Sequence, residues 1–585
     1  MPLPTVAAPR WREPVAAPGA GPISEAAGHP LVGRVLAARG FSDPDAVARF
    51  LDPYHHPRSD PRTFPGVNQA IERLRQAHAR GERVLVWGDF DVDGQTATAL
   101  MTIALRRSGI DAIWYVPDRE RESHGVGPTA PTIVDVRGAS LIVTCDCGLV
   151  DLRVISALAA RGVDTIVTDH HAPGDGSVAV DHPARAVVAA ARLPTDHPAR
   201  HLAGAGMAYA LAAPFLATFQ QSGQDLLDLV ALGTIADVAA LIGDNRRLVA
   251  RGLPSLNQGR RPGIGALLRD ALRREVDDVE TSLAGWTIGP RLNALGRLGD
   301  ASRGVELLLA TDPRDLDRLG TLAAQLNEER QAIGGRVQEE AIEILDRPAE
   351  DVAHRDPVEG LAWSDRDAIV LAREDWPIGI IGLIAQRLAQ DYLRPCALVA
   401  ISGAEGRVSI RSPEWCDLVP VLRELQADEQ LDFSGGGHAS AAGGRIPGGR
   451  IARFAHLFAS AVARQRPAGE LMVIHRPEVA IDLTDVSLAA HRALRRLAPF
   501  GRGNLEPLFI ARDVEVLEAR AIGEAGRHRA YVLGNGRGTR ARAVHWNAVP
   551  VEPGARVDVL AHLGQDAFNE FVGPRLTIRD IRPAR

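Results

Sequence analysis

Residues 83–94 read Arg-Val-Leu-Val-Trp-Gly-Asp-Phe-Asp-Val-Asp-Gly. The first five residues form a short apolar run, which is typical of a buried parallel strand. Similar runs of four or five residues follow at Ala112–Val116, Leu141–Thr144 and Thr165–Thr168. Helical patterns separate these runs, as at Gln95–Arg107 and Val154–Arg161. The alternation predicts βαβ units and therefore an α/β fold with a doubly wound parallel sheet.

Acidic and imidazole side chains follow three of the predicted strands. The first strand is followed by Asp89, Asp91 and Asp93, the third by Cys145-Asp146-Cys147-Gly148, and the fourth by Asp169-His170-His171. Sites in open parallel sheets form outside the carboxyl ends of the strands. We therefore expect these side chains to converge. A further acid, Asp237, directly follows a helical segment.

Crowding of these acids predicts a cation site. Two carboxylates about 4 Å apart repel by roughly 4 kcal/mol at an effective dielectric constant of 20. Oxygen ligands with one or two imidazoles suit Mg²⁺ or Mn²⁺, and imidazole favours Mn²⁺. Two such ions sharing an aspartate could activate a water and clamp a phosphate.

Two other metal sites are alternatives at this point. The DxDxDG string also resembles the start of an EF-hand loop, although Leu100 stands where that loop needs a glutamate. A thiolate site at Cys145 and Cys147 is conceivable, but no second cysteine pair has zinc spacing, and small buried thiols are the simpler interpretation.

The rest of the chain predicts further domains. A helical pattern runs from 312 to 346, a second α/β segment begins at Ala368–Leu371, and short strands with glycine turns, suggesting a small β-barrel, begin near residue 470. The predicted boundaries are 1–75 for a tail and lead-in helices, 76–311 for the catalytic domain, 312–350 for a connecting helix, 351–467 for a second α/β domain, and 468–585 for a nucleic-acid-binding region with a barrel.

No segment predicts secretion or a membrane anchor. The first 22 residues are rich in Pro and Ala and are expected to fray. The longest apolar stretch, Leu202–Phe219, is interrupted by Pro214 and predicts a buried helix. We expect a cytoplasmic protein without a membrane partner.

Charge distinguishes the end of the chain from its body. All 67 basic residues are arginine, which excludes a P-loop lysine, a Schiff-base lysine and a kinase-type ATP lysine. The net charge is −6, yet residues 491–585 hold 16 arginines against 10 acids. A basic C-terminal region on an acidic body suggests that a polyanion binds there; a solvated charged face is the alternative.

The motifs in this order resemble those of the RecJ family within the DHH phosphoesterase superfamily. The resemblance rests on Asp89–Gly94, Asp146–Gly148, Asp169–His171, Gly233–Asp237, Gly289–Ala294 with Gly296-Arg297, Gly435–His438 with Ala441–Gly443, and Leu497–Gly501 with Gly503-Asn504. It covers nearly the whole chain from about residue 30. It implies a DHH domain, a long connecting helix, a DHH-associated domain and a C-terminal OB-fold.

This resemblance implies a 5′→3′ exonuclease specific for single-stranded DNA, which releases mononucleotides in DNA repair and recombination and uses two Mn²⁺ or Mg²⁺ ions. The implied metal ligands are Asp89, Asp91, Asp93, Asp146, His170 and Asp237. Asp146 would bridge the ions and His171 would meet the scissile phosphate; these two, His170 and Arg291 are the implied catalytic residues. The implied substrate-binding residues are Arg291, Asn293, Arg297, Gly436, Gly437 and His438 on the strand, and Ser409, Arg411 and Arg119 at the 5′ end.

The sequence departs from the family pattern in several places. Trp87 stands where many relatives have His, and Ser123-His124 replace a usual Gly-Tyr. Ala189-Ala190 replace a usual Asn-Pro, and Pro377 replaces a His. These departures affect the expected recognition of the DNA end and the position of the strand more than catalysis.

Two other functions compete with the exonuclease hypothesis. A DHH phosphodiesterase for short oligonucleotides or cyclic dinucleotides would explain the metal site but not the basic C-terminal region. A non-catalytic scaffold in a replication or repair complex is disfavoured because all six candidate ligands are present. Single-stranded DNA is the expected partner, together with a single-strand-binding protein and a helicase.

Overall fold

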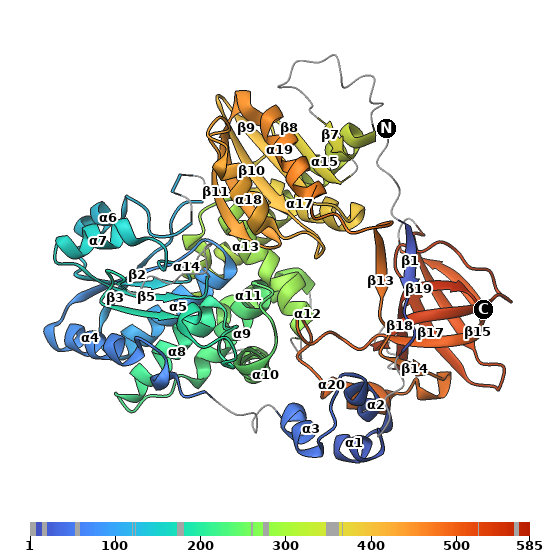
Figure 1. Ribbon diagram of the computed structural model, residues 1–585. Helices are drawn as coiled ribbons and strands as arrows, with labels where there is room; N and C mark the ends of the chain where they lie inside the picture. Colours follow the sequence, from blue (N-terminus) through green and yellow to red (C-terminus); the bar gives the residue numbers. More distant parts are fainter. Residues whose placement is uncertain are drawn as a thin grey trace. The chain divides into compact units, whose positions relative to one another are not determined.

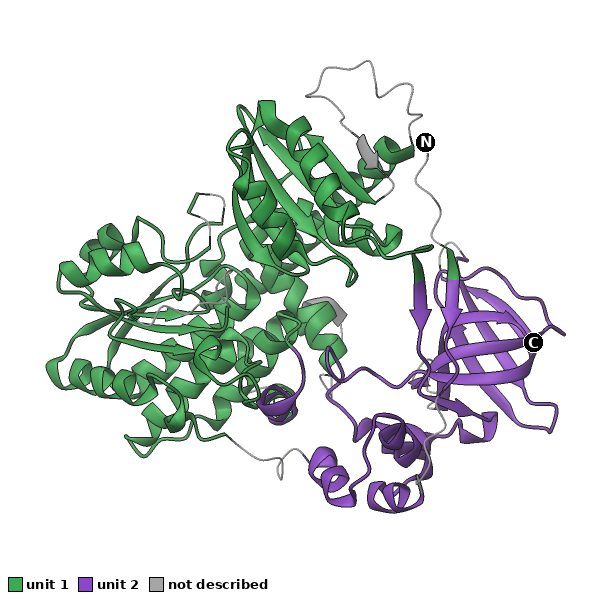
Figure 2. Ribbon diagram, viewed as in Figure 1, with its two compact units in different colours: residues 1–8, 59–239, 252–472 green, residues 9–58, 240–251, 473–585 purple. Residues whose placement is uncertain are grey.

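The computed structural model of the chain describes residues 7–14, 20–52, 59–119, 121–122, 124–171, 181–258, 261–272, 280–346, 362–365, 367–523, 526–566 and 573–584 (Figure 1). The chain forms two compact units, and each is described by itself. The first consists of residues 1–8, 59–239 and 252–472, and the second of residues 9–58, 240–251 and 473–585 (Figure 2).

A parallel sheet of five strands organises the first part of unit 1, in the order β3-β2-β4-β5-β6. Its strands are β2 (Arg83–Trp87), β3 (Asp111–Tyr115), β4 (Leu141–Cys145), β5 (Asp164–Asp169) and β6 (Ala186–Ala189). The predicted doubly wound sheet is confirmed, and each predicted strand lies within one residue of its observed bounds.

Helices cover both faces of this sheet. The side chains of Leu85, Trp87 and Ile142 pack against α6 and α7 on one face. On the other side α5, which connects β2 to β3, packs against α8 and α9. The bounds are α4 Val67–Arg80, α5 Val92–Arg107, α6 Ala130–Arg137, α7 Leu152–Ala160, α8 Gly204–Ala217 and α9 Leu227–Ala236.

The apolar stretch that raised the membrane question is α8, a mostly buried helix that contains Pro214. Among the described residues, no helix combines the length and the apolar character that a membrane crossing requires. The helices that follow are α10 (Gly243–Asn257), α11 (Pro262–Leu272), α12 (Thr281–Leu283), the π-helical segment η4 (Ala284–Ile288), α13 (Gly289–Leu298) and α14 (Ser302–Leu309).

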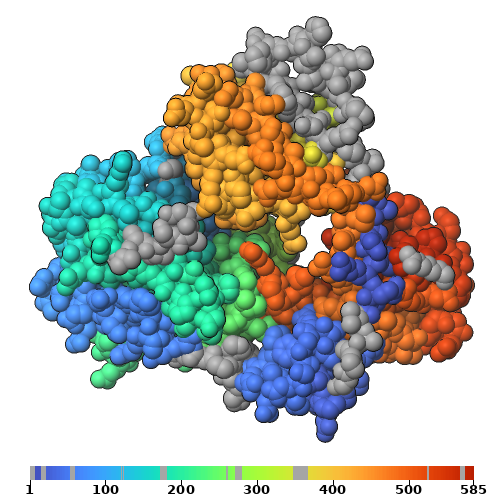
Figure 3. All heavy atoms as spheres, viewed as in Figure 1, coloured from blue at the N-terminus to red at the C-terminus, as the bar shows by residue number. Residues whose placement is uncertain are grey.

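A 34-residue helix, α15 (Pro313–Asp346), leads to the second sheet of unit 1 and confirms the expected connecting helix. Val337 and Ala341 of α15 pack against Ile380 and Ile384 of α17 (Ile378–Tyr392). In Figure 3 the orange residues of this second part of unit 1 lie next to green residues of the first part.

The second sheet has six strands in the order β11-β12-β10-β9-β8-β7, of which only the β8–β9 pair is parallel. The bounds are β7 Ala362–Asp365, β8 Ala368–Arg373, α17 Ile378–Tyr392, β9 Cys396–Ser402, β10 Glu405–Arg411, α18 Leu418–Ala427, β11 Ser434–His438, β12 Ala441–Pro447 and α19 Ile451–Ala463.

Unit 2 is built around a barrel of five strands that closes because β15 pairs with both β16 and β18. This confirms the expected C-terminal barrel. The bounds are β13 Met472–His475, β14 Val479–Ile481, α20 Leu488–Arg495, β15 Phe509–Ile522, β16 His528–Gly534, β17 Arg540–His545, β18 Arg556–Asp566 and β19 Gly573–Pro583.

The N-terminal segment differs from the frayed tail that its composition predicts. Residues Ala7–Trp11 form strand β1, which pairs with β13. The Trp11 indole N–H donates a hydrogen bond of 2.6 Å to Asp580, and the Arg582 guanidinium lies 3.8 Å from its ring centroid. Helices α1 (Ala20–Ala27), α2 (Pro30–Ala38) and α3 (Pro44–Leu51) also pack on the barrel core. The predicted five-part division of the chain stays a prediction.

Candidate metal centre and phosphate pocket

The strand order places the three polar motifs at one edge of the first sheet. The chain leaves β2 for β3 on one side of it and later returns to β4 on the other side. Such a switch point opens a crevice at the carboxyl ends of the strands. Asp89 follows β2, Asp146 follows β4, and Asp169 ends β5.

The first motif turns directly from β2 into helix α5. Asp91 is the N-cap of α5, and its Oδ1 accepts a hydrogen bond of 3.0 Å from the Gly94 N–H. Gly94 has to be a glycine because a Cβ there would lie 2.6 Å from the Asp89 Cβ. The helix begins three residues after Asp89, so the EF-hand alternative is wrong: no twelve-residue loop exists here.

Asp93 is held by the N-terminus of helix α8. Its two carboxylate oxygens accept hydrogen bonds from the N–H groups of Gly204 at 2.6 Å and Ala205 at 2.9 Å. A Cβ on Gly233 would lie 2.6 Å from the Asp93 Oδ1. Burial raises the pKa of Asp93. Sequence reasoning missed Gly204 and Ala205; the Gly-Ala-Gly run before an apolar helix was the available signal.

Asp146 occupies a strained backbone conformation between two buried cysteines. Its φ of 66° lies in the left-handed region that non-glycine residues rarely adopt, and such strain is found mainly at functional sites. Burial and the charges of Asp93 and Asp91 raise its pKa well above the usual range. Burial likewise raises the pKa of the Cys145 and Cys147 thiols, which disfavours the thiolate site considered above.

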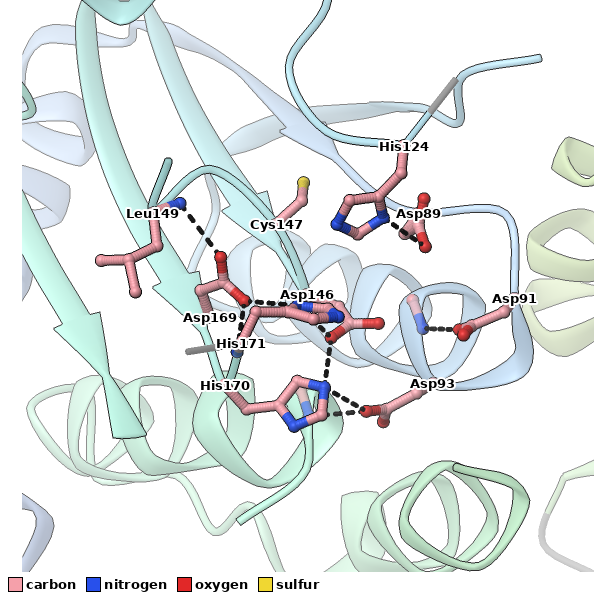
Figure 4. A network of polar contacts seen from close by, with 12 residues as sticks. Asp89, Asp91, Asp93, His124, Asp146, Cys147, Leu149, Asp169, His170 and His171 are labelled. Carbon is pink, nitrogen blue, oxygen red and sulfur yellow. Dashed lines mark hydrogen bonds and ion pairs between the residues drawn. The ribbon is translucent and has the colours of Figure 1, made fainter. Parts of the chain in front are cut away.

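The two adjacent histidines have different partners (Figure 4). His170 Nε2 lies 3.1 Å from Asp146 Oδ1 and 3.8 Å from Asp93 Oδ2. His171 Nδ1 lies 2.9 Å from Asp169 Oδ1, while Asp169 Oδ2 accepts the Leu149 N–H at 3.0 Å. Burial lowers the pKa of His171, but the hydrogen bond to Asp169 and the charges of Asp146 and Asp169 together outweigh it and raise the pKa to about 9. Asp169 therefore orients His171, a role that the sequence analysis did not assign.

A third imidazole reaches the acid cluster from the loop after β3. His124 Nδ1 lies 3.0 Å from Asp89 Oδ2, and the Asp89 charge raises the pKa of His124 to about 10 (Figure 4). The sequence analysis noted His124 only as a departure from the family pattern. Its neighbour Ser123 lies outside the described residues.

The donor set fits divalent cations. Three groups of side chains can each place one ligand atom per residue within 4.8 Å of the others, namely Asp146–His170–His171, Asp93–His170–Asp237 and Asp89–Asp91–Asp146. Burial and the Asp93 charge raise the pKa of Asp237 to about 7. Asp89 Oδ1 is buried and accepts no hydrogen bond from the described residues. Crowded carboxylates with raised pKa values are stabilised by bound cations, so Mn²⁺ or Mg²⁺ suits this set.

Three of the predicted phosphate-binding arginines form a second charged cluster. Burial lowers the pKa of Arg297 to about 9 and that of Arg411 to about 10, and repulsion from Arg119 adds to both shifts. Burial also lowers the pKa of Arg119, against the charges of Asp89 and Asp91. None of the three forms a salt bridge with a described carboxylate.

Neutral groups orient these arginines. Arg297 donates to the Gly379 carbonyl at 2.8 Å, and Arg411 donates to Ser409 Oγ at 3.3 Å. The candidate site contains a cluster of carboxylates and a cluster of arginines, and like charges repel one another within each cluster. Arg119 lies close enough to interact electrostatically with both clusters.

The other predicted substrate residues are less closely tied to this centre. Arg291 donates to the Thr287 carbonyl at 3.0 Å, and its buried Nε has no hydrogen-bond partner among the described residues. Asn293 lies two residues further along α13. Gly436, Gly437 and His438 lie on β11, the exposed edge strand of the second sheet. Their part in binding stays a prediction.

The remaining departures occupy defined positions. Trp87 is fully buried, and its indole N–H donates to the Gly125 carbonyl at 3.2 Å. Ala189 ends β6, and the Ala190 carbonyl accepts a hydrogen bond of 2.5 Å from Arg200. Pro377 is the N-cap of α17.

Family models match three stretches of the chain. Residues 83–234 match the DHH family N-terminal domain, residues 365–464 match the DHHA1 domain, and residues 478–580 match the RecJ OB domain.

Several curated proteins and solved structures that are similar to this chain are named RecJ. The chain is 34% identical to the single-stranded-DNA-specific exonuclease RecJ of Dickeya dadantii, over 84% of this chain and 85% of that protein. It is 28% identical to the Bacillus subtilis protein of the same name, over 94% of this chain and 68% of that protein. The crystal structure of Thermus thermophilus RecJ with Mn²⁺ matches with a TM-score of 0.79 and 27% identity, covering 99% of this chain and 80% of that one.

Proposed function

The chain belongs to the RecJ family of single-stranded-DNA-specific exonucleases, and from this premise we propose that it removes mononucleotides from the 5′ end of single-stranded DNA. The observation that carries the proposal is the juxtaposition of the two clusters described above. Arg119 connects the two clusters, because its charge interacts with the charges of Asp89 and Asp91 and also with those of Arg297 and Arg411.

The six candidate ligands would hold two ions. They are Asp89, Asp91, Asp93, Asp146, His170 and Asp237. Asp146 and His170 each belong to two of the three ligand groups, but only Asp146 has two oxygens with which to bind two ions, which supports its role as the bridging ligand. Two bound divalent ions supply an activated water and stabilise charge on the phosphate.

The protein's own side chains orient the substrate. His171, held by Asp169, presents its other ring nitrogen for a hydrogen bond to the scissile phosphate. Arg291 has a buried donor without a described partner, which suits a backbone phosphate. These residue roles are part of the proposal.

The polarity follows from the arginine cluster. This cluster consists of Arg119, Arg297 and Arg411, and Ser409 lies beside Arg411. The three guanidinium groups form no salt bridge with a described carboxylate. A terminal 5′-phosphate carries more charge than an internal one and suits this pocket better. Because the pocket adjoins the acid cluster, a strand anchored there would be cut after its first nucleotide.

The setting of the reaction is also proposed. A nuclease specific for single strands needs unwound DNA, so a helicase is a fitting partner, and a single-strand-binding protein would occupy the same substrate. DNA repair and recombination in the cytoplasm generate such strands. The OB-type barrel, which belongs to a fold that binds oligonucleotides, would bind part of the strand.

Digestion of end-labelled single strands with Mn²⁺ tests the proposal. A 5′-labelled strand should release its label at once as a mononucleotide, whereas a 3′-labelled strand should shorten in a ladder. The reverse pattern would disprove the polarity. Hydrolysis of dinucleotides without hydrolysis of long strands would instead favour the phosphodiesterase alternative.

A further inference from the structure

His124 is a histidine of the acid cluster that the proposed mechanism does not use. It lies in the loop between β3 and α6, and its Nδ1 is 3.0 Å from Asp89 Oδ2. Its ring centroid is 4.8 Å from that of His171, which in turn is 4.5 Å from that of His170. The three imidazoles thus form a row along the carboxylates in Figure 4.

The loop that carries His124 is fixed on its C-terminal side. The Trp87 indole, fully buried under the sheet's carboxyl edge, donates to the carbonyl of Gly125 at 3.2 Å. The Val126 N–H donates to Asp151 Oδ2 at 2.7 Å. Gly125 has a φ of +97°, and a Cβ there would lie 2.8 Å from the same Asp151 oxygen. These contacts hold the backbone next to His124 and bring its ring to Asp89.

His124 contacts only one of the two carboxylate oxygens of Asp89. Asp89 is 3% exposed, and His124 engages its Oδ2. Its Oδ1 accepts no hydrogen bond from the described residues. Asp89 belongs to the Asp89–Asp91–Asp146 group of candidate ligands, so its contact with His124 fixes a carboxylate that could bind an ion. Hydrogen bonds of this kind fix the orientation of ligating carboxylates.

We propose that His124 is a positioning residue of the metal centre: its contact with Asp89 Oδ2 orients the Asp89 carboxylate, which would hold an ion together with Asp91 and Asp146. Trp87 supports this role by holding the loop. The inference rests on the two-ion centre of the proposed function. Two departures from the family pattern, Trp87 and His124, would then both serve to orient Asp89.

The test is Mn²⁺ binding to the full-length protein without DNA, by calorimetry and by the electron paramagnetic resonance of free Mn²⁺. His124→Ala should weaken one of two Mn²⁺ sites by about 10- to 100-fold, the usual cost of losing such a partner. The other site, with Asp93, His170 and Asp237, should keep its affinity.

Two conservative variants separate positioning from mere packing. In His124→Asn the amide N–H can take the place of the Nδ1 donor, so affinity should return towards the wild-type value. In His124→Gln the amide lies one bond further out, at the Nε2 position, and should not restore it. The proposal would be overturned if His124→Asn bound Mn²⁺ no more tightly than His124→Gln, or if His124→Ala kept the wild-type Mn²⁺ affinity. The comparison of Asn with Gln decides the question even if the Ala variant does not fold.

Further variants serve as controls. Arg121→Ala changes an exposed side chain of the same loop and should leave both Mn²⁺ sites unchanged. Trp87→Phe removes the donor to Gly125 and should weaken the same site as His124→Ala, by a smaller factor. A wild-type protein that binds two Mn²⁺ ions but does not degrade single strands would disprove the proposed function and leave this binding test valid.

Discussion

The arginines of unit 1 serve two different purposes, and their partners distinguish them. Arg73 is buried beside two acids, at 2.6 Å from Glu82 and 2.5 Å from Asp164, and those hydrogen bonds raise its pKa against burial. Arg297 is half-buried, and burial together with repulsion from other arginines lowers its pKa to about 9. The first charge is satisfied within the fold, whereas the second is left for a ligand.

The acid cluster resembles Arg297 in this respect, because its charges also lie among charges of their own sign. The pKa values of Asp146 and Asp237 are raised by loss of solvation and by the charges of neighbouring carboxylates. Like charges without a partner of opposite sign lower the stability of a fold. Proteins retain them mainly at sites that bind a ligand. We propose on this ground that the two clusters are halves of one site, in which the carboxylates attract cations and the arginines attract phosphate.

The largest effect is expected from Asp146→Asn. Loss of the bridging carboxylate should reduce Mn²⁺-dependent hydrolysis of single strands by at least about 100-fold, since outer-shell changes alone cost 10- to 100-fold. The metal-free variant should not unfold more easily than the wild type, because a buried and repelled charge is removed. Rate assays and urea unfolding measure the two effects.

The control for that variant is Asp111→Asn. Asp111 is exposed and paired with Arg83 at 2.7 Å, so this variant should keep full activity. An active Asp146→Asn protein would break the proposed division between functional and structural acids.

Arg411→Ala tests the other half of the site. Losing a charge-assisted hydrogen bond of about 1.5–3 kcal/mol should lower kcat/KM for 5′-phosphorylated strands by roughly 10- to 100-fold. Strands with a 5′-hydroxyl should be affected much less. Arg453→Ala, which removes an exposed arginine paired with Asp428 in the same domain, serves as the control. An equal effect on both kinds of strand would contradict a 5′-phosphate pocket.

The pH dependence of stability should be largest in the metal-free protein. The folded pKa of Asp237, raised to about 7, means that the folded state binds more protons than the unfolded state between about pH 4 and 7, so stability falls as pH rises through this window. Asp93 and Asp146 shift in the same direction. Thermal unfolding should therefore occur at a higher temperature at pH 6 than at pH 7.5.

Added Mn²⁺ should reverse this trend, because the ion binds the deprotonated carboxylates and competes with protons. Its affinity should rise between pH 6 and pH 8. In Asp237→Asn the pH dependence of the metal-free protein should flatten. A metal-free protein that becomes more stable from pH 6 to 7.5 would contradict the raised pKa values.

The smallest effect on activity is expected from Arg73→Ala. Breaking this ion-pair group should lower the free energy of unfolding by about 1–3 kcal/mol, less than for a fully buried pair because Asp164 is 42% exposed. Activity of the folded protein should stay within about twofold, as for a change remote from the site. Urea unfolding and initial rates distinguish this outcome from a role in DNA binding.

Local patterns predicted much of the fold and of the site. The four apolar runs from Arg83 onward predicted four of the five strands of the first sheet within one residue, because strands buried on both faces are continuous apolar runs. The motifs after β2, β4 and β5 predicted the acid cluster, because parallel strands present their carboxyl ends at one edge. The N-terminal strand β1 was missed because its stability comes from contacts with residues far along the chain, such as the Trp11–Asp580 hydrogen bond.

The sequence by itself determined the chemical types in the site: carboxylates, imidazoles and arginines without a single lysine. Only the tertiary structure decided which of them are left unbalanced. The local sequence does not show that the charge of Arg73 is paired with acids while that of Arg297 is not. Nor does it show that Gly204 donates to Asp93, that Asp169 pairs with His171, or that His124 contacts Asp89. The reason is physical: pKa shifts and ligand orientation depend on burial and on distances between segments more than a hundred residues apart, such as Asp93 and Gly204.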